Sequence, residues 1–437
     1  MRRAPIAVLV AWVSSAGAQT RPAPRLDAPA RTEIVDTIAN QFEHLYVDAD
    51  TGHLIAEHLR RRAAQGAYNA AADPDQFAQL LSADLRAIND DHHLFVRYSP
   101  EFPGRRVGPE GVSYRDPDPP PTPAELERDR LAHYLLGKVD ILPGNIGYLE
   151  MRGFSGMPAS RDVLVAALRY LESTDAIIID LRQNGGGDGD MSNFLISHFT
   201  GPDSVLSLRV LDRSTHDTID RWTKATVPGP RRPQVPLYVL TSRASASAAE
   251  DFAFVLHNLG RATLVGERTY GAGHNNVFVD SGHGFLTSIS LTRVMDPRTG
   301  REWERVGVQP DVVVDEQQAL LVAQIMAIEV LTRKATGERH DDLMLIHGTL
   351  EAERKPIRVP PATLARYAGH YEHIVITPQD GHLAFQAYGG IVSPLVALSD
   401  SVFAFGDMRL TFKHAQGGAI ELLLASPDDG NVTLARH

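Results

Sequence analysis

The sequence predicts a layered α/β domain in the middle of the chain, preceded by a bundle of helices and followed by a small all-β module. Three observations support this prediction. Strand-like and helix-like segments alternate between residues 137 and 314. Apolar residues recur at helical spacing across residues 30–90, and short alternating segments separated by glycine turns fill the chain from about residue 364. A chain of 437 residues is too long for one core.

These patterns divide the chain into a signal peptide, a helical domain, a proline-rich linker, the α/β domain, and a second linker with a β-barrel-like module. The corresponding boundaries are 1–18, 19–99, 100–136, 137–340 and 341–437. Prolines are dense between residues 100 and 123, which disfavours regular helix or sheet there.

Within the α/β domain, unbroken apolar runs predict strands that are buried on both faces. The predicted strands are 145–151, 176–182, 235–241 and 262–266. Amphipathic segments between them predict the helices 160–171, 188–199 and 247–259. A long helix is expected at 317–336.

The N-terminus has the form of a signal peptide. Arg2 and Arg3 form a basic region, residues 4–13 a short apolar region, and Ala16-Gly17-Ala18 a small-residue cleavage site before Gln19. We therefore expect export to the periplasm or outside the cell, with cleavage after Ala18. No segment approaches the ~18 consecutive apolar residues of a transmembrane helix.

Composition excludes several classes of function. The chain has no cysteine, so it has no disulfides, cysteine nucleophiles or thiolate metal sites. The formal net charge of −11 argues against a nucleic-acid partner, because proteins that bind nucleic acids carry basic surfaces. We expect no cofactor and no metal.

Ser247 is the strongest candidate for a nucleophile. It stands where the predicted strand 235–241 gives way to a helix, at the sheet edge where open α/β folds place their sites. The Ala248 amide is one of the unpaired donors at the helix start and could face a developing oxyanion. The alternative is that Ser247 is an ordinary helix cap.

A glycine-rich turn after another buried strand could supply further oxyanion donors. Residues 180–187 read DLRQNGGG, and their glycines permit a close approach of the backbone to a ligand. The alternative is a tight turn without a binding role. A phosphate-binding loop is excluded because no Gly-Lys-Ser/Thr follows.

A serine nucleophile needs a base, and histidine is the expected one. No lysine occurs between Lys224 and Lys334, which removes a lysine base from the region after Ser247. Four imidazoles are candidates: His92, His93, His274 and His283. A lone histidine is more often structural than catalytic, so each of the four has that alternative. Glu304 could orient an imidazole, or it could be a surface carboxylate.

The motifs together resemble the tail-specific serine peptidases, and among them the retinoid-binding-protein-like and tricorn-core branch. The resemblance covers about residues 30–335. In family order the motifs are DHHL at 91–94, NIGY at 145–148, DLRQNGGG at 180–187, TSRASASAAEDF at 241–252, VGERTYGAGH at 265–274 and WERVGVQPD at 303–311.

The resemblance implies a ClpP/crotonase-like catalytic domain and a set of site residues. The implied catalytic residues are Ser247 as nucleophile, His93 as base and Glu304 as its orienting acid, with oxyanion donors from Gly186, Gly187 and Ala248. The tail-specific branch carries a lysine where this chain has Ala272. His92 stands where relatives often have a small or hydroxylated residue, so the choice between His92 and His93 stays open.

The expected activity is hydrolysis of peptide bonds in peptides or unfolded proteins. Two alternatives remain: a non-catalytic protein that binds apolar ligands, and an esterase or amidase with the same machinery. Only about 45 residues separate His93 from the first strand of the α/β domain, too few for a PDZ-like insert, so capture of substrate tails by such a domain is not expected. The C-terminal module resembles small β-barrels appended to exported serine hydrolases and implies no chemistry.

Overall fold

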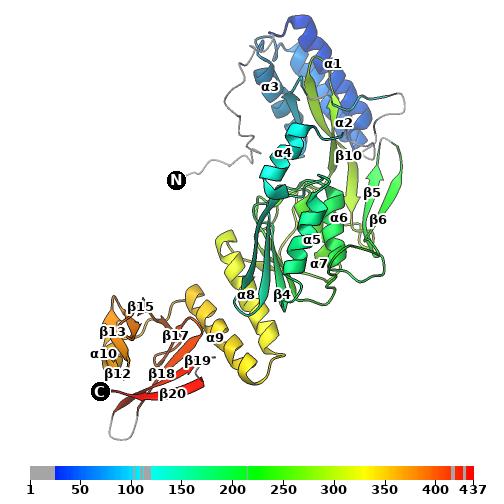
Figure 1. The fold of residues 1–437 in the computed structure, drawn as a ribbon. Coiled ribbons are helices and arrows are strands. Elements are labelled where there is room, and N and C mark those ends of the chain that lie inside the picture. Colours follow the sequence, from blue (N-terminus) through cyan, green and yellow to red (C-terminus); the bar gives the residue numbers. More distant parts are fainter. Residues whose placement is uncertain are drawn as a thin grey trace.

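A computed structural model shows an N-terminal lobe, a central domain and a C-terminal module arranged along one long molecule (Figure 1). The predicted signal peptide, 1–18, lies outside the residues that the structure describes. Those residues are 25–101, 104–108, 112, 120–213, 215–414, 419–426 and 430–437. Among them, no helix combines the length and apolar character needed to cross a membrane.

Three helices form most of the N-terminal lobe: α1 (Ala28–Leu45), α2 (Ala49–Ala64) and α3 (Pro74–Arg86). Each begins after an aspartate whose side chain accepts a backbone N–H of the first turn, the usual N-cap arrangement. The helices also pack on a sheet. Buried side chains of all three share one core with Val277, Phe285 and Ile289 from strands much later in the chain.

The central domain is built on a sheet of six strands in the order β11-β8-β7-β4-β3-β2. The pairs from β3 through β11 are parallel, whereas β2 is an antiparallel edge strand. The strand bounds are β2 Leu136–Leu142, β3 Ile146–Met151, β4 Ala176–Asp180, β7 Leu237–Thr241, β8 Thr263–Gly266 and β11 Val312–Val313.

Helices cover both faces of this sheet, so the predicted layered α/β domain is confirmed. Ile177 and Ile179 of β4 pack with α5 (Ser160–Tyr170), α6 (Gly189–His198) and α7 (Ala248–Asn258). Ile178 points to the other face and packs with α8 (Glu316–Thr332). Burial on both sides explains the unbroken apolar run of β4.

A second sheet joins the N-terminal lobe to the central domain. Its strands are β1 (Phe95–Tyr98), β5 (Leu206–Asp212), β6 (Thr218–Trp222), β9 (Asn275–Asp280) and β10 (Phe285–Met295). The first half of β10 pairs with β1, and its last residues pair with β5. Figure 1 shows β10 running from the helical lobe down into the central domain.

The segment expected to be a linker ends in a short helix. α4 (Pro123–Leu131) starts with a capping box between Thr122 and Glu125, and Pro123 stands at its first position, where no N–H is needed. A 3₁₀ turn, η1 (His133–Leu135), then leads into β2. The long helix predicted at 317–336 is α8, which ends four residues earlier at Thr332, and a further helix, α9 (Gly337–Arg354), follows it.

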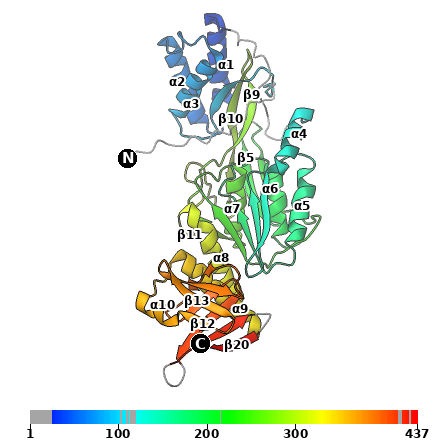
Figure 2. The ribbon, with the colours of Figure 1, turned by 60° about the vertical axis from the view of Figure 1, so that its left-hand side comes forward.

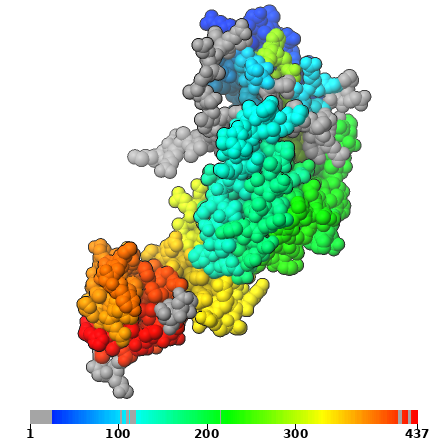
Figure 3. Space-filling model, in the orientation of Figure 1, coloured from blue at the N-terminus to red at the C-terminus, as the bar shows by residue number. Residues whose placement is uncertain are grey.

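The C-terminal module has its own apolar core and consists of α10 (Pro361–Tyr367) and two antiparallel sheets, as predicted for an all-β region. The strands are β12 Gly369–Tyr371, β13 Ile374–Gln379, β14 His382–Ala387, β15 Ser393–Pro394, β16 Val396–Ala397, β17 Val402–Phe405, β18 Met408–His414, β19 Ile420–Ser426 and β20 Gly430–Ala435. Figures 2 and 3 show the module as a separate lobe beside α8 and α9.

Candidate active site

Ser247 lies at the junction of β7 and α7 with a strained backbone. Its φ is 53° and its ψ is −117°, a conformation that a residue with a side chain rarely adopts. Such strain costs on the order of 1–3 kcal/mol and persists only where the surroundings enforce it. A serine on a sharp, strained strand-to-helix turn is the arrangement that exposes a nucleophilic hydroxyl in α/β hydrolases.

Glu250, fully buried one turn into α7, enforces this conformation. Its Oε2 accepts the Ser247 amide at 2.9 Å and the Ala272 amide at 2.7 Å. Its Oε1 accepts the Thr269 hydroxyl at 2.5 Å and the Gly271 amide at 2.7 Å. Burial raises the pKa of Glu250, against which these donors act. One carboxylate thus fastens the serine turn to the loop that precedes β9.

The glycine-rich turn after β4 lies directly against the serine turn. A Cβ added to Gly186 would lie 2.7 Å from the Ser247 Cβ and 3.1 Å from the Ala248 amide nitrogen. The Gly186 amide donates to the Asn184 side chain at 2.9 Å. Because this bond uses the Gly186 N–H, the Gly187 and Ala248 amides are the stronger candidates to donate hydrogen bonds to an oxyanion. Ala248 is the first residue of α7, where an N–H has no partner within the helix.

His93 lies between α3 and β1, on the N-terminal lobe. Its amide donates to Asp91 Oδ1 at 2.9 Å, and its ring Nδ1 lies 3.8 Å from the same oxygen. Burial lowers the pKa of His93 to about 4, although the charge of Asp91 opposes the shift. The imidazole is therefore neutral near pH 7, as a general base must be.

The other imidazoles fall into different places. The ring of His92 packs on Tyr270, with centroids 4.1 Å apart, and the Tyr270 amide donates to the Ser245 carbonyl at 2.9 Å. His92 therefore contacts the loop beside the serine turn. His283 instead pairs with Glu33 at the surface of the N-terminal lobe, with Nε2 2.9 Å from Glu33 Oε2.

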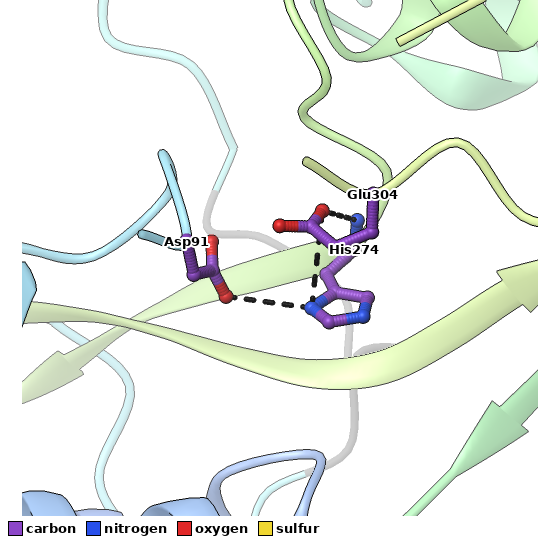
Figure 4. Close-up of side chains that lie close together, drawn as sticks. All are labelled: Asp91, His274 and Glu304. Atoms are coloured by element: carbon purple, nitrogen blue, oxygen red, sulfur yellow. Dashed lines mark hydrogen bonds and ion pairs between the residues drawn. The ribbon is translucent and has the colours of Figure 1, made fainter. Parts of the chain in front are cut away.

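His274 lies between two buried carboxylates (Figure 4). Its Nδ1 is 3.4 Å from Asp91 Oδ2 and 3.9 Å from Glu304 Oε2. Glu304 Oε2 also accepts the amides of Gly273 at 2.6 Å and His274 at 3.0 Å. The contacts of Glu304 thus run to His274 and its loop, and the path from Glu304 to His93 passes through His274 and Asp91.

Electrostatics couple these three groups. Burial works against the charge of Asp91, but the hydrogen bond from His274 and the neighbouring imidazoles hold its pKa below the usual range. Burial and the Asp91 charge raise the pKa of Glu304 to about 7. Burial alone would lower the pKa of His274, but the Asp91 hydrogen bond and the Glu304 charge raise it overall.

Sequence reasoning missed Asp91 and Glu250 as parts of the site. The spacing Ser247-x-x-Glu250 is a capping-box pattern and could have indicated that the carboxylate reaches back to the serine amide. Asp91 lies two residues before His93, a spacing that allows its carboxylate to accept the amide of that residue.

Comparisons with known proteins bear on the family of the chain. The model of "Peptidase family S41" matches residues 145–314, and "N-terminal domain of Peptidase_S41 in eukaryotic IRBP" matches residues 28–143. A carboxyl-terminal-processing protease of Synechocystis is 29% identical over 229 residues, which are 52% of this chain and 50% of that protein. Carboxyl-terminal-processing peptidase 3 of Arabidopsis thaliana chloroplasts is 30% identical over 181 residues, 38% of this chain and 31% of that protein.

Among solved structures, a lipoprotein from Streptococcus agalactiae aligns with a TM-score of 0.49 and 17% identity, over 70% of this chain and 98% of that one. The chain spans half or less of the length of the two curated relatives described above.

A mostly parallel sheet covered by helices on both faces, with a strained serine at a strand-to-helix turn, defines the class: an α/β protein with a serine-centred site. Within that class, residues 145–314 match peptidase family S41, and residues 28–143 before them match that family's N-terminal domain. The resemblance drawn from the sequence motifs is thereby confirmed.

Proposed function

We propose that this protein is an exported serine peptidase that hydrolyses peptide bonds in unstructured peptides and unfolded proteins, with Ser247, His93 and Glu304 as its catalytic set. The observation that carries the proposal is the backbone of Ser247: φ is 53°, and Glu250 and the Gly186 turn hold the residue from two sides. Backbone strain of this kind is concentrated at active sites and ligand-binding sites.

In the proposed reaction, neutral His93 removes the proton from the Ser247 hydroxyl as its oxygen attacks the peptide carbonyl. The resulting oxyanion is stabilised by the Gly187 and Ala248 amides, with Gly186 contributing if Asn184 releases it. Collapse of the tetrahedral intermediate breaks the C–N bond, and His93 donates its proton to the leaving amine. Water then hydrolyses the acyl-enzyme by the same steps, which restores Ser247 and His93.

Glu304 supports this reaction from a distance. Its contacts run through His274 to Asp91, and Asp91 holds the turn that carries His93. The curated relatives are named for processing at carboxyl termini. For this chain we propose general unstructured peptides, since the segment between His93 and β2 leaves too little room for a PDZ-like domain to capture a tail.

The proposal is tested with the mature protein and a mixed peptide library. Wild-type protein should cleave peptides and react covalently with a fluorophosphonate probe, whereas Ser247→Ala should do neither. Ser204→Ala, at an exposed serine of the same domain, is the control and should behave as wild type. Wild-type protein that cleaves nothing and binds apolar ligands would favour the non-catalytic alternative, and activity confined to small esters would favour the esterase.

Export is a separate part of the proposal, supported by Arg2, Arg3, the apolar segment 4–13 and the Ala16-Gly17-Ala18 motif. N-terminal sequencing of protein recovered from outside the cytoplasm should begin at Gln19. Exported protein that still begins at Met1 would contradict cleavage after Ala18.

A further inference from the structure

The nucleophile and the proposed base belong to different parts of the molecule. His93 lies on the N-terminal lobe, whose core is formed by α1–α3 and strands β1, β9 and β10. Ser247 lies in the central domain, whose sheet has a separate core. A displacement of about 1 Å between reacting groups can lower a rate roughly a hundredfold. The site therefore needs a contact that fixes one part against the other.

Asp91, His274 and Glu304, here called the clasp, form such a contact. Asp91 belongs to the N-terminal lobe, whereas His274 and Glu304 belong to loops beside the serine turn. His274 Nδ1 is 3.4 Å from Asp91 Oδ2, while Asp91 Oδ1 accepts the His93 amide at 2.9 Å. In Figure 4 both carboxylates face the same ring nitrogen, and the other ring nitrogen points away from them.

The clasp needs an extra proton, because without one the Asp91 and Glu304 carboxylates would both be charged at close range. Asp91 is fully buried, and the Glu304 side chain is 3% exposed, so water screens neither charge well. Two buried carboxylates beside a neutral imidazole would repel each other, and the single N–H of that ring could donate to only one of them. Glu304 Oε1 is buried and has no hydrogen-bond partner among the described residues. A single proton on His274 or Glu304 removes the repulsion.

The same atoms could be considered for a metal ion, since their ligand atoms lie within 4.8 Å of one another. The oxygens nearest to His274 are, however, already in use. Asp91 Oδ2 accepts the Tyr46 hydroxyl at 3.0 Å, and Glu304 Oε2 accepts two backbone amides. Because these oxygens already accept hydrogen bonds, we infer a proton rather than a cation beside His274.

We propose that His274 is a positioning residue for the peptidase reaction: it holds a proton between Asp91 and Glu304, and so keeps His93 aligned with Ser247. This inference rests on the proposed function, and it assigns His274 no contact with the substrate. Because the clasp requires its proton, activity must fall at alkaline pH as that proton is lost.

The raised pKa values of His274 and Glu304 agree with this direction. Stabilisation by a group with a raised folded-state pKa is complete below its unfolded value, about 6.5 for histidine, and is lost as pH rises through the folded value. The other charged or titratable groups that act on the clasp are Glu302, His93 and Tyr46, and Arg305 acts on Tyr46.

The test compares His274→Gln and His274→Lys with wild type in full pH profiles of kcat and KM. The Gln variant cannot hold the proton, so kcat should fall roughly tenfold or more, with KM changed less than about twofold. The Lys variant keeps the charge, so it should recover part of kcat and move the alkaline limb up by at least about one pH unit. His257→Gln, which removes a surface histidine paired with Asp311, is the control and should leave both limbs in place.

An unchanged alkaline limb in His274→Gln would overturn the proposal. So would loss of activity on treatment with EDTA that zinc restores, because the site would then hold a metal. If His274→Gln does not fold, wild-type stability still decides, because the clasp requires the thermal unfolding midpoint to fall as pH rises above neutrality. A midpoint that stays flat from pH 7 to about 9.5 would count against it.

A second experiment separates this inference from the proposed function. In Ser247→Ala protein, which needs no activity, the unfolding midpoint should fall on the alkaline side, and adding His274→Gln should remove that slope. If wild type hydrolyses nothing while this slope is present, the peptidase proposal fails and the clasp stands. If wild type is active and the slope is absent, the clasp fails alone.

Discussion

Gly186 lies against Ser247 so closely that a Cβ at position 186 would lie 2.7 Å from the Ser247 Cβ. Gly186 also has a φ of 104°, which disfavours any side chain. The turn after β4 and the turn after β7 can therefore meet only because residue 186 is a glycine. This contact brings the predicted oxyanion donors beside the predicted nucleophile.

Gly186→Ala should consequently displace the serine turn and lower kcat by roughly a hundredfold or more, as loss of oxyanion stabilisation does. Gly185→Ala is the matched control, since nothing lies within 4 Å of a Cβ at that position. Steady-state kinetics on one peptide measure both variants. Equal activity of the two alanine variants would show that the close contact does not matter for turnover.

Glu250→Gln should damage both the fold and the site. One oxygen would become an NH₂ group facing two donors, either Ser247 and Ala272 or Thr269 and Gly271. Each buried donor left without an acceptor costs about 1–3 kcal/mol.

Chemical denaturation should therefore show a large loss of stability, and probe labelling of Ser247 should weaken at temperatures where the variant is folded. Glu267→Gln, in the same loop, is the control. Its carboxylate lies 3.5 Å from an exposed arginine, Arg243, and its loss should change stability by less than about 1 kcal/mol. Similar stability losses in the two variants would contradict the assigned role of Glu250.

The acid limit of activity should lie below the ordinary histidine range. Burial lowers the pKa of His93 to about 4, so the free enzyme keeps its base neutral at pH values where an unperturbed imidazole, near 6.5, would be protonated. The pH profile of kcat/KM should therefore fall near pH 4 to 5 rather than 6.5.

The stability of the fold should also decrease toward acid pH, in the same direction as the activity. A base that stays neutral in the folded state but takes up a proton when unfolded makes stability fall as pH drops from about 6.5 toward 4. An acid limb at pH 6.5 that disappears in His92→Gln and persists in His93→Gln would assign the base to His92.

Removal of residues 356–437 should leave the site intact. The C-terminal module has a core drawn entirely from residues 359–434, whereas Leu343 and Leu350 of α9 pack with the central domain. A chain ending at Lys355 keeps α9 and every proposed catalytic group. It should retain hydrolysis of a small activated ester within about threefold of the full chain, as expected when no interaction made in the transition state is removed. A folded truncation without turnover would show that the module contributes to the site.

Ser247→Gly probes the strained backbone. Glycine adopts positive φ without penalty, so this variant should be more stable than Ser247→Ala by about 1 kcal/mol, even though both are inactive. Thermal unfolding of the two variants measures the difference. A less stable glycine variant would show that the observed φ costs nothing in this turn.

Much of the architecture follows from local patterns. The runs that form β4 and β7 are apolar at every position because both faces of the sheet are covered, and α5 and α7 begin and end within one residue of expectation. Polar or short elements carried no such signal. The helices α4 and α9 and the edge strand β6 were not predicted, since they bury little or stand at an edge.

For the site, the sequence by itself determined that a serine and a glycine turn each follow a buried strand of one α/β domain, where the carboxyl ends of parallel strands share one edge. That these two strands, β4 and β7, are neighbours in the sheet was decided by the tertiary structure. The sequence also determined that a lysine base is absent near Ser247. Only the tertiary structure decided which acids meet which imidazole. Asp91 lies 183 residues from His274, and a contact across that separation depends on how β10 joins the two parts of the molecule. The periodicity of the sequence cannot predict such a contact, because the contact stabilises the packed state and does not affect the conformation of either segment alone.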